Sequence, residues 1–284
     1  MNTLTIARFT IQEAISRRLI LAGAVLSLAF LALFSLGFFL IYTNNSEFSG
    51  PMSDPQEQAM FGTVMSVLGL YAINFLAGFL ALFLSVGAIS SEIDSGALHA
   101  VLARPLRRVE FVVGRWLAYA GLIGVYVGVM AGSLLLSAWL IADYTTPDPT
   151  RAVLLMMLSA VVLLTVSLLG STMLSTLANG VVVFSLFGLA WLAGIIEFIG
   201  GMLSNEAMLN TGTTVSLLIP SDAIWRGASY YVLSPVYLAG VQSAQEGMPF
   251  VGNTPPATPM VIWALCYPLV LLGAAMMTFS RRDL

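Results

Sequence analysis

Few side chains in this sequence could carry acid–base, nucleophilic or metal chemistry. Histidine and cysteine occur once each, as His99 and Cys266, whereas a metal centre needs several such ligands and a disulfide needs two thiols. All eleven basic residues are arginine, so the chain lacks the lysine that a P-loop, a protein kinase or a Schiff-base enzyme requires. We therefore expect no catalytic residue, no metal site and no cofactor bound by this chain.

Charged side chains gather instead in one stretch, residues 90–116. It holds four of the eleven arginines, three of the fourteen acidic residues and the single histidine, between two long uncharged runs. Ser90 or Ser91 can cap a helix that places Glu92 and Asp94 in its first turn, where the helix dipole favours acids. The stretch is therefore the first place to look for a site.

A short amphipathic helix is the structure that this stretch favours. Its apolar stripe recurs at helical spacing and includes Leu98 and Leu102, with His99 beside them. Arg104 would stand at the C-terminal end, and Pro105 would end the helix because its ring clashes with the preceding turn. A second helical start then leads toward the next apolar run. From the residues alone, a cytoplasmic loop lying on lipid headgroups is an equally good interpretation.

The composition predicts an all-α polytopic membrane protein. The chain is 58% hydrophobic and 9% charged, whereas soluble domains are about 25% charged. An apolar helix of about 20 residues crosses the hydrocarbon layer of a bilayer. We predict one transmembrane domain over residues 1–284 with six spans, at about residues 19–42, 60–89, 117–142, 152–174, 181–203 and 259–280. The long uncharged run that contains the fourth and fifth spans is expected to turn at residues 175–180, where Asn179-Gly180 is the strongest breaker.

Residues 1–18 predict an amphipathic helix at the membrane surface. Apolar side chains recur on one side, and Arg8, Glu13, Arg17 and Arg18 lie mostly elsewhere. A signal peptide is the rival interpretation. The apolar run that follows is longer than a typical signal core, and no A-x-A-like cleavage site follows it, so we expect an uncleaved anchor.

Residues 204–258 hold apolar pieces that are too short to cross a bilayer. We expect one or two short helices there, one of them starting at Pro220-Ser221-Asp222, with Ser221 or Asp222 as the cap that precedes it. Two polar residues fall inside predicted spans and are candidates for a transport pathway, Asn74 and Glu197. Glu197 lies close to the end of its span, so a solvated acid at the membrane interface is the favoured alternative for it.

The arginines predict the orientation of the spans. With six spans and a cytoplasmic N-terminus, both termini and residues 90–116 are cytoplasmic, and residues 204–258 are extracytoplasmic. The cytoplasmic side then holds nine arginines, and the other side holds only Arg151 and Arg226, as the positive-inside rule requires. With a net charge of −3 and no basic tail or patch, nucleic acid is not an expected partner.

The stretch 90–116 resembles the cytoplasmic loop of type-2 ABC transporter permeases, an exporter-like family. That loop has an acid, a glycine a few residues later, an apolar helix, Arg-Pro, and a Gly-Lys or Gly-Arg pair before the next span. The corresponding residues here are Glu92, Gly96, Arg104-Pro105 and Gly114-Arg115. Ala97 stands where the family most often has threonine, and Arg115 where it often has lysine. The N-terminal helix, the six spans and the large segment before the last span resemble the family as well.

The resemblance implies a membrane-spanning permease that does not hydrolyse ATP itself. A separate ATPase subunit, with ATP and magnesium, would dock on the cytoplasmic loop and on the N-terminal helix. Its closure would pass to the spans through a coupling segment, whose residues are Glu92, Asp94, Gly96, Leu98, His99, Leu102, Arg104 and Pro105. A second permease chain, identical or paralogous, would complete the pathway in the cell (inner or plasma) membrane.

Two alternatives stand beside a permease. One is a membrane scaffold or immunity-type protein that binds a partner through the loop while nothing crosses. The other, an intramembrane enzyme, is disfavoured because no predicted span carries paired aspartates, a Ser–His pair or a metal motif. For a permease, the apolar spans favour export of a hydrophobic or amphipathic substrate.

Overall fold

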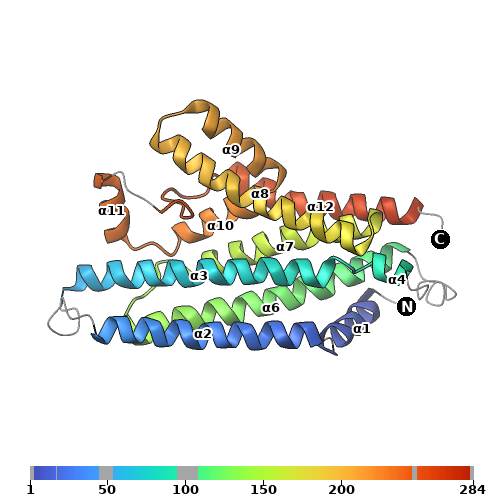
Figure 1. Cartoon of the computed structure of the whole chain (residues 1–284), viewed down its shortest axis with the longest axis horizontal. Helices are drawn as coiled ribbons and strands as arrows, with labels where there is room; N and C mark the ends of the chain where they lie inside the picture. The colour runs from blue at the N-terminus through green and yellow to red at the C-terminus, as the bar shows by residue number, and fades with distance from the viewer. Residues whose placement is uncertain (1–2, 17, 45–53, 95–107, 245–247, 282–284) are drawn as a thin grey trace.

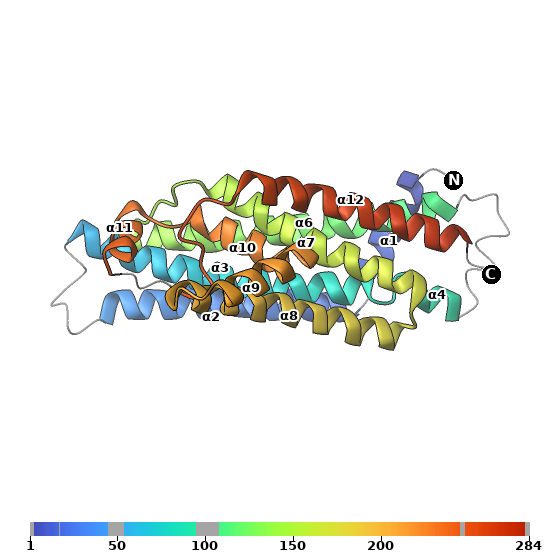
Figure 2. The ribbon, with the colours of Figure 1, turned by 90° about the horizontal axis from the view of Figure 1, so that it is seen from above.

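The computed structural model is a bundle of helices, most of which run along one long axis (Figures 1 and 2). It describes residues 3–16, 18–44, 54–94, 108–244 and 248–281, and within these ranges no strand occurs. The helices are α1 (Thr3–Ser16), α2 (Arg18–Asn44), α3 (Pro55–Ser85), α4 (Ser90–Asp94), α6 (Arg108–Ala142), α7 (Pro149–Met173), α8 (Thr176–Met202), α9 (Glu206–Leu218), α10 (Ser221–Tyr230), α11 (Pro235–Ala244) and α12 (Thr258–Arg281).

Six helical segments of the described chain are long and apolar enough to cross a membrane, which confirms the predicted all-α, six-span fold. They are Leu21–Thr43, Pro55–Glu92, Arg108–Ala142, Pro149–Met173, Thr176–Met202 and Thr258–Arg281. Helix α1, helix α4 and the C-terminal part of α12 lie at one end of the bundle, which we call the α1 end; α11 lies at the other (Figure 1). The chain is thus a multi-pass membrane protein.

Local sequence signals explain where two of the long helices begin. Asp54 precedes α3 and accepts a hydrogen bond from the backbone N–H of Gln56 at 2.9 Å. Asp148 precedes α7 and accepts one from the N–H of Arg151 at 3.0 Å. In both helices proline follows the cap, at a position where its missing N–H has no helical partner to lose.

The turn between α7 and α8 is shorter than predicted. Helix α7 ends at Met173, and Ser175 caps α8, which begins at Thr176. The placement of Asn179 in the turn is therefore wrong. It lies inside α8, buried, and its Nδ2 donates to the backbone oxygens of Val86 at 2.8 Å and of Ser167 at 2.9 Å. The amide thus joins the end of α3 to α7 and α8.

Helix α7 is the centre of the bundle, and α2 is the least buried span. Helix α7 packs against α3, α6, α10 and α12, and its inward face includes the buried Met156, Leu163 and Leu164. On α3, a Cβ at Gly69 would lie 2.3 Å from a methyl group of Leu134. Small residues therefore allow close helix packing, as expected in a membrane bundle.

The segment before the last span folds into three short helices, α9, α10 and α11. Helix α9 packs along α8 as a hairpin (Figure 1), α10 packs on α7, and α11 lies against α3. The predicted cap of α10 is wrong: Ser221 and Asp222 both lie inside the helix, and the cap position is Pro220, which makes no side-chain cap bond. Burial of α10 against α7 accounts for its position instead.

Replacement of the buried amide tests this packing. Asn179→Ala removes the donor for two buried carbonyl oxygens, and an unsatisfied buried polar group costs about 1–3 kcal/mol. We expect a lower denaturation temperature for the purified protein, measured by intrinsic fluorescence. Asn210→Ala, at an exposed position on α9, is the matched control and should leave it unchanged. Equal stability of the two variants would contradict the joining role of Asn179.

Candidate functional site

A buried arginine joins three segments at the α1 end. Arg115 lies in α6, and its side chain is only 4% exposed. Its guanidinium forms a salt bridge with Glu92 of α4 and donates a hydrogen bond to the backbone oxygen of Ala88. Its Nη2 also lies 3.7 Å from a carboxylate oxygen of Glu13 in α1. We call Glu13, Glu92 and Arg115 the arginine cluster.

The arginine cluster holds charges that the bundle interior would otherwise disfavour. Two acids surround one guanidinium, whose carbon lies 4.7 Å from the centroid of the Phe111 ring. A buried charge is tolerated when it is paired and hydrogen-bonded, and the loss of one partner of such a pair is strongly destabilising. Arg115 therefore fixes the position of α4 and of α1 relative to α6.

Gly114 lets α1 approach α6 closely enough to complete this cluster. A Cβ at this position would lie 2.8 Å from Cγ2 of Ile6 and 3.0 Å from the backbone oxygen of Thr3. The side of α1 that packs on α6 carries Ile6 and Ala14, both buried. The glycine of the Gly114-Arg115 pair thus supplies the space, and the arginine supplies the charge.

The amphipathic helix at the N-terminus differs from its prediction in two respects. Phe9 and Ile15, expected on the same face as Ile6 and Ala14, are 58% and 60% exposed. The buried side of α1 thus packs on the protein, and a second apolar side remains exposed. Arg18 belongs to α2 and not to the surface helix.

Helix α4 is held by the neighbouring turn as well as by Arg115. A short turn separates it from the end of α3, so α3 and α4 form one nearly continuous segment. The hydroxyl of Ser90 lies 2.8 Å from that of Thr176 at the start of α8. Motion of α4 would therefore reach α3 directly, and α8 through this hydrogen bond.

The structure describes only part of the predicted coupling segment. Glu92 and Asp94 lie in α4, and Glu92 is in the arginine cluster. Among the surface-helix residues, Arg8 is exposed on α1 and Glu13 joins the cluster. The predicted residues outside the described ranges are Arg17, Gly96, Leu98, His99, Leu102, Arg104 and Pro105. The sequence prediction noted Arg115 only as part of the Gly114-Arg115 motif.

A second charged cluster joins α8 to α10. Arg226 of α10 donates from Nη2 to Glu197 of α8 at 2.6 Å, and its Nε lies 3.1 Å from Oδ2 of Asp222. Glu197 is therefore an ion-pair partner of α10 and is only partly exposed, unlike the solvated acid that was favoured. Sequence reasoning missed Asp222 and Arg226, whose i, i+4 spacing on a short helix was the available signal. Asn74, the other pathway candidate, lies buried in α3.

Burial changes the acidity of this second cluster. Removal from water raises the pKa of Asp222 to about 7; Arg226 opposes the rise, and the charge of Glu197 adds to it. Asp222 packs so closely on α8 that a Cβ at Gly194 would overlap its carboxylate. Within the described residues, no group of three His, Cys, Asp or Glu side chains is arranged to hold a metal ion.

Comparison with known families finds a match over nearly the whole chain. Residues 5–284 match the model of the ABC-2 family transporter protein. The chain belongs to this family. No curated protein matches it at a significant level. The match covers α1 to α12, so the six spans and the short helices before α12 all lie within the family's domain. An ABC-2 chain is the membrane component of a transporter, and the family normally works with an ATPase subunit.

Gly114 offers a direct test of the arginine cluster in this ABC-2 protein. Gly114→Leu would push α1 away from α6, and overpacking of this kind costs about 1–3 kcal/mol. We expect faster trypsin cleavage at Arg8 and a lower denaturation temperature. The control is Gly121→Leu on the same helix, where a Cβ would meet nothing within 4 Å. Similar cleavage rates in both variants would show that α1 does not depend on Gly114.

Asp222 should make the stability depend on pH. The folded protein keeps its proton up to about pH 7, whereas the pKa of an ordinary aspartate is 3.8. Between these two pH values the folded state binds more protons than the unfolded state does. The contribution of Asp222 to the free energy of unfolding therefore falls as pH rises, by up to about 1.4 kcal/mol per pH unit. Asp222→Asn should remove this slope in thermal denaturation between pH 4 and 7. Glu206→Gln, exposed at the start of α9, should retain it; a slope unchanged in Asp222→Asn would refute the assignment.

Proposed function

We propose that this chain is the permease of an ABC transporter, driven by a separate ATPase subunit that docks at the α1 end. The arginine cluster carries the proposal, because Arg115 connects the predicted coupling segment, through Glu92, with the surface helix, through Glu13. A force applied to α4 or to α1 is thereby delivered to α6. The near continuity of α4 with α3 provides a second route into the spans.

The distribution of charge supports docking at this end. Nine of the eleven arginines fall on the side predicted to be cytoplasmic, where ATP is available. Arg108, at the start of α6, donates to the backbone oxygens of Phe279 and Ser280 near the end of α12, each at 3.4 Å. Contacts among α1, α4, α6 and α12 thus stabilise the end of the bundle at which the ATPase would dock. Both termini would be cytoplasmic in the cell membrane.

The proposed substrate is hydrophobic or amphipathic. Helices α3 and α8 face each other through a ladder of aromatic rings, with Phe75 contacting Phe187 at 5.5 Å and Phe79 contacting Phe184 at 6.0 Å between ring centroids. Phe184 is 56% exposed, so this ladder reaches the surface of the single chain. A second permease chain facing α3 and α8 would enclose a pathway with apolar walls, suited to export of such a solute.

Charge exchange across the arginine cluster tests the coupling. In a complex with its ATPase subunit in lipid nanodiscs, Glu92→Arg or Arg115→Glu alone should lower ATP hydrolysis several-fold, because each places like charges at the buried position of residue 115. The double exchange should restore part of the loss. Glu206→Arg, at an exposed site on α9, is the control variant. The measurement is the rate of phosphate release per complex.

The outcomes separate a permease from a scaffold. Single exchanges that leave hydrolysis and complex formation unchanged would contradict coupling through the cluster. An ATPase that never co-purifies with the chain would favour a protein that binds another partner and transports nothing.

A further inference from the structure

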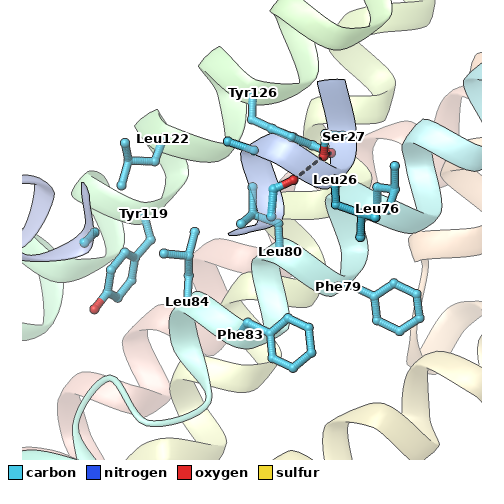
Figure 3. A pocket seen from close by; sticks show the side chains of 13 residues that line it. Leu26, Ser27, Leu76, Phe79, Leu80, Phe83, Leu84, Tyr119, Leu122 and Tyr126 are labelled. Carbon is cyan, nitrogen blue, oxygen red and sulfur yellow. Dashed lines mark hydrogen bonds between the residues drawn. The ribbon is translucent and has the colours of Figure 1, made fainter. Parts of the chain in front are cut away.

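An apolar pocket opens between α2, α3 and α6, close to the α1 end (Figure 3). Its volume is about 250 Å³. Helix α2 contributes Gly23 and Leu26, α3 contributes Leu80 and Phe83, and α6 contributes Leu122, while α1 borders it with Ala14. No charged side chain lines it. None of the residues of the two ion-pair clusters lines it.

The pocket exists because the wall formed by α2 lacks bulk. A Cβ at Gly23 would meet no atom within 4 Å, and the neighbouring Ala24 adds only a methyl group to the lining. Protein interiors are normally packed as densely as organic crystals. A hollow of this size beside a sparsely packed span therefore has room for a group that the chain itself does not supply.

Three lining residues carry hydroxyl groups, Ser27, Tyr119 and Tyr126, and two of these hydroxyls bond to each other. Ser27 donates from Oγ to the backbone oxygen of Gly23 at 2.8 Å, which leaves Tyr126 to donate to Ser27 at 2.6 Å (Figure 3). Water in a cavity needs two to four polar partners, and apolar cavities stay dry. An apolar occupant thus fits this lining better than water or a polar solute does.

The mouth of the pocket faces the membrane. Leu26 is 62% exposed and Phe83 is 57% exposed, and both belong to helices that cross the bilayer. Apolar side chains at this depth contact hydrocarbon chains. Helix α1, amphipathic and with exposed Phe9 and Ile15, is suited to the interface where lipid headgroups lie. A lipid could therefore keep its headgroup near α1 while one chain enters the pocket.

We propose that this pocket binds one acyl chain of a membrane phospholipid. The bound chain fills the space beside Gly23 and packs between Leu80, Phe83 and Leu122, so that it becomes part of the contact between α2 and the rest of the bundle. The proposal requires only that the chain spans a membrane. It stands whether or not the ATPase experiment supports transport.

Photolabelling tests the proposal. The full-length protein is placed in nanodiscs that contain a phosphatidylcholine with a photoreactive diazirine in one acyl chain, then extracted into lipid-free detergent, washed and irradiated. We expect labelled peptides to concentrate in residues 76–84 and 119–126, because only a retained lipid survives washing. Peptides around Leu269 and Val270 of α12, which are exposed to bulk lipid, should carry little label.

A leucine at Gly23 would occupy the pocket. Gly23→Leu should reduce labelling of the two pocket segments several-fold. Gly37→Leu is the matched control, because it lies on the same helix, meets nothing within 4 Å and is outside the pocket lining. Gel filtration of both variants checks that they remain folded.

Three results would overturn the proposal. The first is equal labelling of the pocket segments in both variants, and the second is washed protein that carries no phospholipid. The third comes from a variant with a photoreactive residue at position 83 in place of Phe83. If irradiation crosslinks this residue only to a second copy of the chain, the pocket is part of a contact between chains.

Discussion

A guanidinium that is buried among apolar helices needs acidic partners close to it. This need for ion pairing explains which segments meet at the α1 end of the bundle. Arg115 has one acidic partner on α1 and another on α4, so a single side chain on α6 contacts two separate segments. Gly114 makes the approach of α1 sterically feasible. Ion pairing thus depends on Arg115 and close packing on the adjacent Gly114. Neither interaction by itself would place α1 and α4 against α6.

A comparable arrangement lies between α8 and α10. Arg226 is set between Glu197 and Asp222, so one cation again serves two acids and joins a span to a shorter helix. Between these two clusters the described helices pack mainly through apolar and small residues, including the buried face of α7. Ion pairs therefore add a link between two short helices, α4 and α10, and a span each, while apolar contacts hold the spans together. This division agrees with the weak selectivity of apolar packing in a lipid environment.

The six spans and the amphipathic start were predictable because apolar length and charge patterns act locally. The helix starts at Asp54 and Asp148 follow from the same local rules. The error at Asn179 arose because a tertiary environment, with two carbonyl oxygens at hydrogen-bonding distance, overrides the turn preference of Asn-Gly. Partners distant in sequence, such as Glu197 with Arg226, are not encoded in any local pattern. For that reason Glu92 and Glu197 could be nominated from the sequence, but their pairing with Arg115 and Arg226 could not.

The sparse packing of α2 has a consequence for the biogenesis of the protein. Helix α2 precedes α3 and α6, the two spans that it packs against, and its hydrogen-bond partner Tyr126 lies 99 residues beyond Ser27. Because N-terminal segments are synthesised first, α2 enters the bilayer without its contacts to α6, which has the larger interface with it. A helix with few obligatory contacts tolerates their absence, since nearly all of its surface is compatible with lipid. The same low burial that leaves room beside Gly23 thus suits α2 to the interval before α6 has been inserted.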